Sequence, residues 1–377
     1  MTLVLTHYRA PFHERVREIL AADGIDYQLI YGAPTGASAA RSDTVDLGWA
    51  TRVDARPLTL FGRELHWQPV LGMTRGAALV IASQENKLLA NYWFQLRQVL
   101  GLGPFAFWGH GRNLQSRRPD GMSERLKRRL ALHAHWWFAY TPGTRQFLES
   151  LGFPADRITV FNNAVDTATL AAERDAITPE EIEAFRRDHG LGDGPIGLYV
   201  GGLYADKRLD YLIRSAYLVQ QRLPSFRLLV AGAGPQADIV EAAAASHPFI
   251  RYLGPRFGRD KALCAAASSV FMLPAAAGLA VLDSFAYGLP VVTLADHGHG
   301  PEFEYLEDGS NGLVLPHGTP AAGYSDAVTG LLADTELGGR LRAGARASAR
   351  AYSIESMARS FCDGVRAALA RDRSAKP

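Results

Sequence analysis

Residues 271–292 read FMLPAAAGLAVLDSFAYGLPVV, and this stretch decides the fold. An apolar run ends at Pro274, small residues lead to Gly278, and apolar positions then recur at helical spacing as far as Gly288. A second apolar run follows directly. The pattern predicts a strand, a turn, a helix and another strand, which is the unit from which parallel sheets are built.

The same alternation of short apolar runs with helical patterns fills both halves of the chain. We expect an α/β protein with two Rossmann-like, doubly wound parallel-sheet domains at 1–165 and 194–355, joined by a strand-free linker at 166–193. A C-terminal helix at 356–377 is expected to pack back on the N-terminal domain. Two such domains would face a central cleft lined by strand C-termini and helix N-termini, where anionic ligands bind in open α/β sheets.

The composition is that of a globular protein. The chain has 377 residues, 47% hydrophobic and 21% charged, with a mean hydropathy of -0.06. These values exclude disordered, collagenous and coiled-coil chains and a multi-span membrane protein. The run from Ala262 to Leu282 carries no charge and is long enough to cross a bilayer, but Pro274 interrupts it. We therefore predict strand, turn and helix there.

Two features favour a cytoplasmic location. Only Cys264 and Cys362 are present, which excludes a disulfide framework and a metal cluster built on thiolates. The first twenty residues are interrupted early by His7, Arg9 and Glu14, so they lack the apolar core of a signal peptide.

The net charge of +2 gives no general reason to expect nucleic acid as a partner, but one stretch is strongly basic. Residues 112–129 hold seven cations against Asp120 and Glu124, and the cations are Arg112, Arg117, Arg118, Arg125, Lys127, Arg128 and Arg129. Four apolar residues lie in or near the same helical pattern, namely Leu126, Leu130, Trp136 and Trp137. We predict that this cluster docks on an anionic membrane, such as the inner face of the plasma membrane. The alternative is a solvated helix face.

Two segments could bind an anion. In YVGGLYADKRLDYL, Gly201 and Gly202 end an apolar run and Lys207 stands where a helix opens, so its ammonium could reach a phosphate. The alternative is a lysine on a helix surface. The amides at 278–280 begin the helix of the quoted stretch and lack intrahelical acceptors, so we expect them to form an anion-binding site. The small residues there could instead serve close packing alone.

A third segment, LLVAGAGPQA, has the letters of a dinucleotide fingerprint at Gly232, Gly234 and Ala237. The fingerprint needs an acidic residue about 20 positions later to bind the ribose, and the next apolar run ends in Gly254 and Pro255 instead. We interpret the segment as a tight turn from strand to helix, with a nicotinamide-dependent dehydrogenase as the alternative.

In order and spacing, these segments are similar to the retaining GT-B glycosyltransferases of glycosyltransferase family 4. Members read roughly V-G-R-L-x-x-x-K-G/R, then G-x-G-P, then E-G-F-G-L-x-x-x-E-A-x-A-x-G-x-P-V-V. The matching residues are Val200, Gly201, Leu203, Lys207, Gly232, Gly234, Pro235, Gly278, Leu279, Ala286, Gly288, Pro290, Val291 and Val292. The N-terminal half is similar through YRAPF, WGHG and the run NAVD at 163–166. The resemblance implies a GT-B fold whose N-terminal domain binds an acceptor and whose C-terminal domain binds a nucleotide sugar.

Two departures from the family pattern concern the donor. Gly202 replaces the arginine that members place on the donor diphosphate, for which Arg208 could compensate. Ala275 replaces the first glutamate of the E-x7-E pair, which contacts the transferred sugar, and Asp283 stands in place of the second, which binds the ribose. The segment 274–279 looks closest to members that read P-G-x-x-G-L and lack the first glutamate.

The resemblance also assigns contacts outside these motifs. His110, at the end of FAFWGHG, corresponds to the histidine that contacts the donor sugar near the reacting carbon; the alternative is a buried structural histidine. Arg9 could bind acceptor or phosphate, or lie on the surface. After the apolar run VVTLA, we expect contacts with the sugar from His297, His299 and Glu302, of which Glu302 matches the family's P-E.

Together these residues predict a metal-independent, retaining glycosyltransferase with no cofactor. It would move a sugar from a nucleotide-diphosphate sugar to a glycan or lipid-linked saccharide, in bacterial polysaccharide or glycoconjugate synthesis. The expected ligands of the diphosphate are Lys207, Arg208, Gly278, Leu279 and Ala280, and the expected catalytic residues are His110 and Lys207. A His-x-His with carboxylates at 297–304 could seat a metal, but the glycines beside it do not fix ligand geometry. The alternative function is a catalytically degenerate protein that binds a sugar nucleotide.

Overall fold

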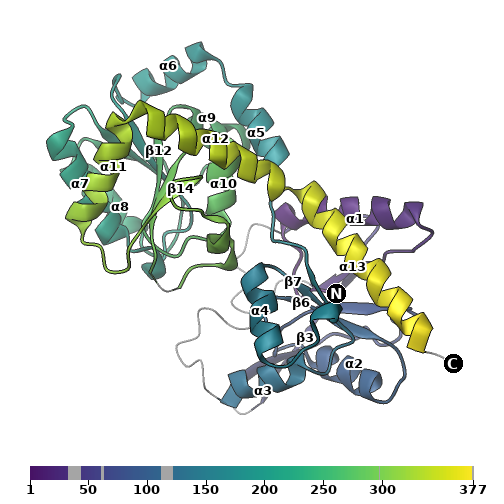
Figure 1. The fold of residues 1–377 in the computed structure, drawn as a ribbon. Coiled ribbons are helices and arrows are strands. Elements are labelled where there is room, and N and C mark those ends of the chain that lie inside the picture. The colour runs from purple at the N-terminus through teal and green to yellow at the C-terminus, as the bar shows by residue number, and fades with distance from the viewer. Residues whose placement is uncertain (33–43, 61–62, 112–121, 297, 376–377) are drawn as a thin grey trace. The chain divides into compact units, whose positions relative to one another are not determined.

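The computed structural model describes residues 1–377 except 33–43, 61–62, 112–121, 297 and 376–377 (Figure 1). The chain folds into two compact units. Unit 1 comprises Met1–Asn163 together with Ile354–Pro377, and unit 2 comprises Ala164–Ser353. Each contains a parallel sheet with helices, so the predicted α/β class is confirmed.

Unit 1 is built on a parallel sheet of four strands in the order β5-β6-β7-β8. These are β5 (Val80–Ser83), β6 (Phe105–Gly109), β7 (Trp136–Ala139) and β8 (Ile158–Val160). Two pairs accompany them: β1 (Ile30–Gly32) with β2 (Thr51–Val53), parallel, and β3 (Arg56–Leu60) with β4 (Arg63–Trp67), antiparallel. The α-helices are α1 (Ala10–Ala22), α2 (Leu89–Val99), α3 (Met122–Ala131), α4 (Pro142–Ser150) and α13 (Ile354–Ala375), and the short 3-10 helices are η1 (His7–Arg9) and η3 (Ala155–Arg157).

Unit 2 is built on a parallel sheet of six strands in the order β11-β10-β9-β12-β13-β14. The strands are β9 (Ile196–Val200), β10 (Arg227–Ala231), β11 (Ile250–Tyr252), β12 (Val270–Leu273), β13 (Val291–Leu294) and β14 (Gly312–Leu315). The α-helices are α5 (Thr167–Asp175), α6 (Pro179–Asp188), α7 (Leu209–Arg222), α8 (Ala237–Ser246), α9 (Gly258–Ala266), α10 (Ala280–Tyr287), α11 (Ala321–Ala333) and α12 (Thr335–Ala351), and the 3-10 helices are η4 (Ala205–Lys207) and η5 (Pro301–Tyr305).

The strand order of unit 2 reverses between β9 and β12. The chain first winds outward from β9 through β10 to β11 and then returns to the other side of β9 with β12, β13 and β14. In register, Val270 lies beside Gly197 and Phe271 beside Leu198. All residues of β9, β12 and β13 are buried. Such a switch point is where open α/β sheets bind ligands, outside the carboxyl ends of the strands.

The segment 166–193, which we expected to be a linker, forms α5 and α6 and groups with unit 2. Ile177 is buried, and Leu170, Ile182 and Phe185 pack against the core cluster of this unit. Thr178 and Glu181 form a reciprocal capping box at the start of α6. Burial of these apolar side chains gives the segment a place in the core, which a free linker would not have.

Helix α13 packs against α1 within unit 1, although most of the chain separates the two in sequence (Figure 1). The Phe361 ring lies 5.4 Å from the rings of Phe12 and Phe161 and 4.5 Å from that of Phe138. At Gly364 an added Cβ would lie 2.5 Å from Thr159 Oγ1, so α13 approaches β8 too closely for a side chain there. The C-terminal helix therefore completes the core of unit 1.

The stretch Ala262–Leu282 forms the end of α9, the strand β12 and the start of α10, so the predicted strand, turn and helix are confirmed. Among the helices that the structure describes, none combines the length and the apolar character needed to cross a membrane.

We predict that Phe361→Ala lowers the free energy of unfolding of unit 1 by about 3–5 kcal/mol, because it opens a cavity among packed aromatic rings. All six tryptophans (Trp49, Trp67, Trp93, Trp108, Trp136 and Trp137) lie in unit 1, so tryptophan fluorescence in a urea titration reports this unit alone. The control Leu58→Ala removes a side chain that is 49% exposed in β3 and should change the value by no more than about 0.5 kcal/mol. Equal destabilisation by the two variants would contradict the role of α13.

Candidate functional site

The switch point of unit 2 brings together two of the predicted anion-binding segments. Gly201 directly follows β9 and Pro274 directly follows β12. From η4, Lys207 reaches across and donates a hydrogen bond from Nζ to the Ala276 carbonyl at 2.5 Å. Burial lowers the pKa of Lys207, and the nearby Asp206 opposes this effect. A partly desolvated ammonium therefore lies against the loop that follows β12.

The loop between β12 and α10 is held in an unusual conformation. Ala276 has a φ of 43°, in the left-handed region that residues with a Cβ rarely adopt. Its carbonyl accepts a hydrogen bond from Lys207, and the amide of the next residue, Ala277, donates one to His299. Strain of this kind costs on the order of 1–3 kcal/mol and persists only where the surroundings fix it.

Three backbone amides at the start of α10 are available to a ligand. Gly278, Leu279 and Ala280 are each partly exposed, and within the described part of the chain their amides donate to no other protein group. The first amide of this turn with an internal acceptor is that of Val281, which donates to the Gly278 carbonyl at 2.9 Å. Unpaired amides at a helix N-terminus attract anions.

One histidine fixes this loop in place. His299 Nδ1 accepts a hydrogen bond from the Ala277 amide at 3.0 Å, so Nε2 carries the proton and donates to the Leu294 carbonyl at 2.8 Å. The ring stacks on Phe303 and is buried, and burial lowers the pKa of His299. Because backbone groups engage both nitrogens, His299 positions the loop. The contact with the sugar that we expected from it would break one of these bonds.

Glu302 is buried beside the same loop. Its carboxylate oxygen Oε2 lies 3.6 Å from the position of a Cβ added to Gly278 and 2.6 Å from that of a Cβ added to Gly300. The carboxylate therefore lies beside Gly278, the residue at which the open amides begin. His297, the remaining candidate of this segment, lies outside the described residues.

Asp283 and Arg208 each have a charged partner. Both carboxylate oxygens of Asp283, in the first turn of α10, lie 3.2 Å from Lys261 Nζ, and the two side chains are largely buried. Arg208 has a φ of 52°, pairs with Asp296 and lies with its guanidinium 4.6 Å from the centre of the Tyr211 ring. The charge of Arg208 is therefore already balanced by Asp296.

The structure explains the glycine at 202. A Cβ added there would lie only 2.4 Å from the ring of Tyr204, so this ring occupies the space in which the family pattern places an arginine side chain. Ala275, at the other departure from the family pattern, is buried.

The glycines of GAGP serve close packing of backbones. A Cβ on Gly232 would lie 1.9 Å from the Gly201 carbonyl oxygen, and one on Gly234 would lie 2.4 Å from the Leu203 carbonyl oxygen. These contacts favour the interpretation as a tight turn over a dinucleotide site.

Arg9 and His110 lie together in unit 1. The Arg9 guanidinium is buried and donates to Asn163 Oδ1 and to the Tyr140 hydroxyl, the latter at 3.3 Å. The ring of His110, which follows β6, lies 4.6 Å from the ring of Tyr140. Both predicted residues thus contact one tyrosine at the carboxyl end of β7.

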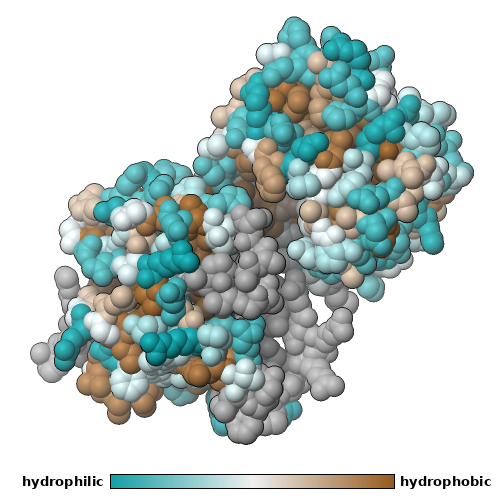
Figure 2. Space-filling view, turned by 180° about the vertical axis from the view of Figure 1, so that it is seen from behind, coloured by the Kyte–Doolittle hydropathy of each residue, from teal (hydrophilic) through white to brown (hydrophobic). Residues whose placement is uncertain are grey.

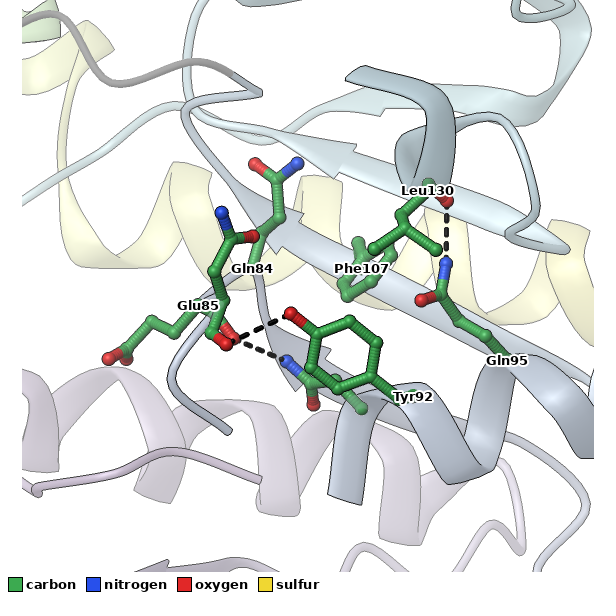
Figure 3. Close-up of a pocket in the computed structure, with 8 residues that line it drawn as sticks. Gln84, Glu85, Tyr92, Gln95, Phe107 and Leu130 are labelled. Atoms are coloured by element: carbon green, nitrogen blue, oxygen red, sulfur yellow. Dashed lines mark hydrogen bonds between the residues drawn. The ribbon is translucent and has the colours of Figure 1, made fainter. Parts of the chain in front are cut away.

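A small pocket of about 10 Å³, with room for about one water molecule, lies beside α2 in unit 1 (Figure 3). Its lining is mostly uncharged and polar, and consists of Gln84, Glu85, Asn86, Asn91, Tyr92, Gln95, Phe107 and Leu130. Tyr92 donates to the Asn86 carbonyl at 3.0 Å and Gln95 to the Leu130 carbonyl at 2.6 Å. Both polar atoms of the Gln84 side-chain amide are buried, and neither has a hydrogen-bond partner among the residues that the structure describes. The pocket can therefore both donate to and accept from a hydroxyl group.

The basic cluster is described only in part. Arg112, Arg117 and Arg118 lie outside the described residues, as do the side chains of Glu124, Leu126 and Lys127. Arg125 and Arg129 are exposed on α3 and Arg128 is half-buried. We expected Leu126 and Leu130 to form an apolar stripe with Trp136 and Trp137 nearby. Leu130 lines the pocket and both tryptophans are buried, so these three do not accompany the cations at the surface. No group of three or more His, Cys, Asp or Glu side chains in the described ranges is arranged to hold a metal ion.

Residues 194–334 match the model of a family described as glycosyl transferases group 1. An alpha-D-kanosaminyltransferase of Streptomyces kanamyceticus is 29% identical over 192 residues, which are 46% of each chain. A GDP-mannose-dependent alpha-(1-6)-phosphatidylinositol monomannoside mannosyltransferase of Mycolicibacterium smegmatis is 27% identical over 204 residues, 51% of each. The chain thus spans about half the length of the curated relatives that it matches.

Solved structures resemble the whole chain. Anabaena HepE, in complex with UDP, has a TM-score of 0.69 at 15% identity over 97% of this chain and 98% of its own. The sucrose-phosphate synthase of Thermosynechococcus elongatus has a TM-score of 0.68 at 19% identity over 98% and 96%. The chain shares the GT-B fold of these glycosyltransferases. The group 1 match at 194–334 lies within unit 2, which holds Lys207, the amides at 278–280 and the His299 contacts.

We predict that the His299 clamp makes stability depend on pH. Burial lowers the pKa of His299 below its ordinary value of 6.5, so the unfolded state binds the proton first. The stability that the neutral ring contributes is therefore fully present above pH 6.5 and is lost as the pH falls below it. The free energy of unfolding, measured by urea titration with circular dichroism, should fall more between about pH 7.5 and 5.5 in the wild type than in His299→Asn. The asparagine offers the Ala277 amide an acceptor that does not titrate, so identical pH profiles would contradict this prediction.

Proposed function

We propose that the protein transfers a sugar from a nucleotide-diphosphate sugar to a saccharide acceptor. The observation that carries this proposal is the juxtaposition of the Lys207 ammonium and the open amides at 278–280 at the switch point of unit 2. HepE, which shares the fold, was crystallised with UDP and with UDP-glucose. As the glycosidic bond breaks, negative charge builds on the diphosphate. A fixed ammonium and fixed amides would stabilise that charge without reorganising.

The remaining donor contacts follow from the same loop. We propose that Asp283 binds the ribose hydroxyls, because each of its oxygens keeps a lone pair beside the one that Lys261 engages. Glu302 would contact the transferred sugar in place of the glutamate that Ala275 lacks. Arg208 would add its charge to the diphosphate only by giving up Asp296.

The reaction would retain the anomeric configuration and need no metal. In the family that the sequence resembles, the leaving phosphate itself assists deprotonation of the acceptor on the front face, so no enzymic nucleophile is required. For His110 we propose contact with the transferred sugar, and for Arg9 contact with an acceptor or phosphate. The small polar pocket beside α2 offers hydrogen-bonding groups to a single acceptor hydroxyl.

We propose a cytoplasmic enzyme of bacterial polysaccharide or glycoconjugate synthesis, held to an anionic membrane by the cluster at 112–129. The second candidate is a protein that binds a sugar nucleotide without turnover. It is favoured by the Tyr204 ring that fills the place of an arginine at Gly202, and by the buried Ala275. A thermal-shift screen of nucleoside diphosphates and their sugars identifies the donor, because a ligand at 100 times its Kd stabilises by about 2.7 kcal/mol. Binding without turnover would favour the second candidate.

Lys207→Met should lower turnover of the identified donor by about 10²–10³-fold, as the loss of one donor to a developing oxyanion does. The methionine keeps the alkyl stem and removes only the charge. Lys87→Met, at an exposed position of unit 1, is the matched control and should leave turnover unchanged. Turnover by Lys207→Met within threefold of the wild type would remove Lys207 from the mechanism.

Activity should survive chelation by EDTA, because Lys207 and the amides at 278–280 would meet the diphosphate charge that a metal meets elsewhere. Initial rates are compared after dialysis with and without EDTA. Complete loss that manganese or magnesium restores would show that the charge on the diphosphate is balanced by a metal instead.

A further inference from the structure

The strained backbone of unit 2 surrounds a single side chain. Hydrophilic residues cover most of the face of this unit that Figure 2 shows, with apolar residues scattered among them, so the composition of this face does not mark a further site. Among the non-glycine residues that the structure describes, those with a positive φ are Asn162, Arg208 and Ala276. The last two lie in unit 2, and both adjoin Lys207, because Arg208 follows it in the chain and Ala276 accepts its hydrogen bond.

Arg208 joins the 3-10 helix η4 to α7 in the left-handed conformation. Its φ is 52° and its ψ is 53°, values that glycine adopts freely and that residues with a Cβ rarely adopt. Lys207 is the last residue of η4, so its direction depends on the backbone of Arg208. A return of Arg208 to an ordinary conformation would move η4, and the Lys207 ammonium with it, relative to the loop after β12.

Two side chains hold the Arg208 guanidinium. Asp296 Oδ2 accepts a hydrogen bond from Nη1 at 2.5 Å, and the guanidinium lies 4.6 Å from the centre of the Tyr211 ring. Tyr211 is itself fixed, because its hydroxyl donates to the Thr319 carbonyl at 2.8 Å. The Asp296 side chain is 11% exposed and that of Arg208 is 42% exposed. The arginine is therefore held by a partner that is better buried than itself.

Asp296 is anchored from a third loop as well. Its Oδ1 accepts a hydrogen bond from the Gly318 amide at 3.0 Å and lies 2.6 Å from His317 Nδ1. Burial alone would raise the pKa of Asp296, but the Gly318 amide, His317 and Arg208 outweigh it and lower that pKa, so the carboxylate is charged at neutral pH. Asp296 follows β13, and β9 and β13 lie on either side of β12. The ion pair thus joins the two loops that flank the loop of Ala276.

We propose that Asp296 is a positioning residue for Lys207. Its ion pair keeps Arg208 in the left-handed conformation, and this conformation directs the Lys207 ammonium to the Ala276 carbonyl. Arg208 then stays with Asp296 when a donor binds, rather than adding its charge to the diphosphate. This role rests on the proposed function, in which Lys207 stabilises the leaving diphosphate.

Substitutions at position 208 distinguish the positioning role from a contact with the diphosphate. Arg208→Gly and Arg208→Ala remove the same guanidinium, but only glycine adopts the left-handed conformation without cost. With the donor that the thermal-shift screen identifies, Arg208→Ala and Asp296→Asn should each lower kcat by about tenfold, because a misplaced group stabilises the transition state less well. The kcat of Arg208→Gly should be about fivefold or more above that of Arg208→Ala.

The double variant tests whether the two residues act through one another. In the Arg208→Gly background, Asp296→Asn should change kcat by less than about twofold, since glycine needs no partner to hold it. The asparagine keeps an acceptor for the Gly318 amide. The matched control is Asp326→Asn, which breaks the ion pair between Arg222 of α7 and Asp326 of α11 in the same unit and should leave kcat unchanged.

The pKa of Lys207 tests the positioning role without turnover. Burial lowers this pKa, so release of the ammonium from the loop should raise it. Competitive acetylation over a range of pH, with the Lys207 peptide quantified by mass spectrometry, measures the value. It should be higher in Arg208→Ala than in Arg208→Gly. Because both variants lack the same charge, the difference reports the position of the ammonium.

Equal kcat values of Arg208→Gly and Arg208→Ala, or equal pKa values of Lys207 in the two, would overturn the proposal. So would a loss of kcat in Asp296→Asn that persists in full in the Arg208→Gly background. If the wild type binds no nucleoside diphosphate, the proposed function fails, and the comparison of Lys207 pKa values alone decides whether Asp296 and Arg208 position this lysine.

Discussion

The two hydrogen bonds of His299 set the geometry on which the candidate site depends. They join the carbonyl at the end of β13 to the amide of Ala277 in the loop after β12. From the other direction, Lys207 holds the carbonyl of Ala276. Two adjacent peptide groups are thus fixed by side chains, which accounts for an alanine that keeps a φ of 43°. The amides that follow are left at the start of α10, partly exposed, where an anion can reach them.

This arrangement bears on how the protein can tolerate its departures from the family pattern. The arginine missing at Gly202 is not replaced by a cation, because the Tyr204 ring fills its space and Arg208 is paired with Asp296. The positive potential at the switch point therefore rests on Lys207 and on the backbone amides. With fewer side-chain cations, a rigid loop after β12 matters more. If that loop moved, the backbone amides would no longer be oriented to stabilise an anion. The histidine at 299 supplies that rigidity.

The sequence predicted the features that depend on local pattern. Glycine and proline punctuation at 274–290 and the repeated apolar runs were enough for two parallel α/β units. Lys207 contacts the Ala276 carbonyl, in the loop that leads to 278–280. The role of His299 was not predictable, since it depends on a hydrogen bond to a residue 22 positions away. The segment 166–193 was interpreted as a linker because it lacks strands, but its apolar residues are buried by helices that follow much later in the chain. The antiparallel pair β3 and β4 was likewise missed, because neither strand has a long apolar run.

Helix α2 shows that a periodic pattern of apolar residues predicts a buried face but does not predict the environment of the opposite face. Apolar residues at helical spacing predict a buried face, and Ala90 and Phe94 satisfy that expectation completely. The second stripe, at Trp93, Leu96 and Leu100, then has no place in the core of unit 1. Polar residues of the same helix line the pocket beside it. One helix thus carries a buried stripe, an exposed stripe and polar residues that line a pocket, and its periodicity alone does not say which stripe enters the core.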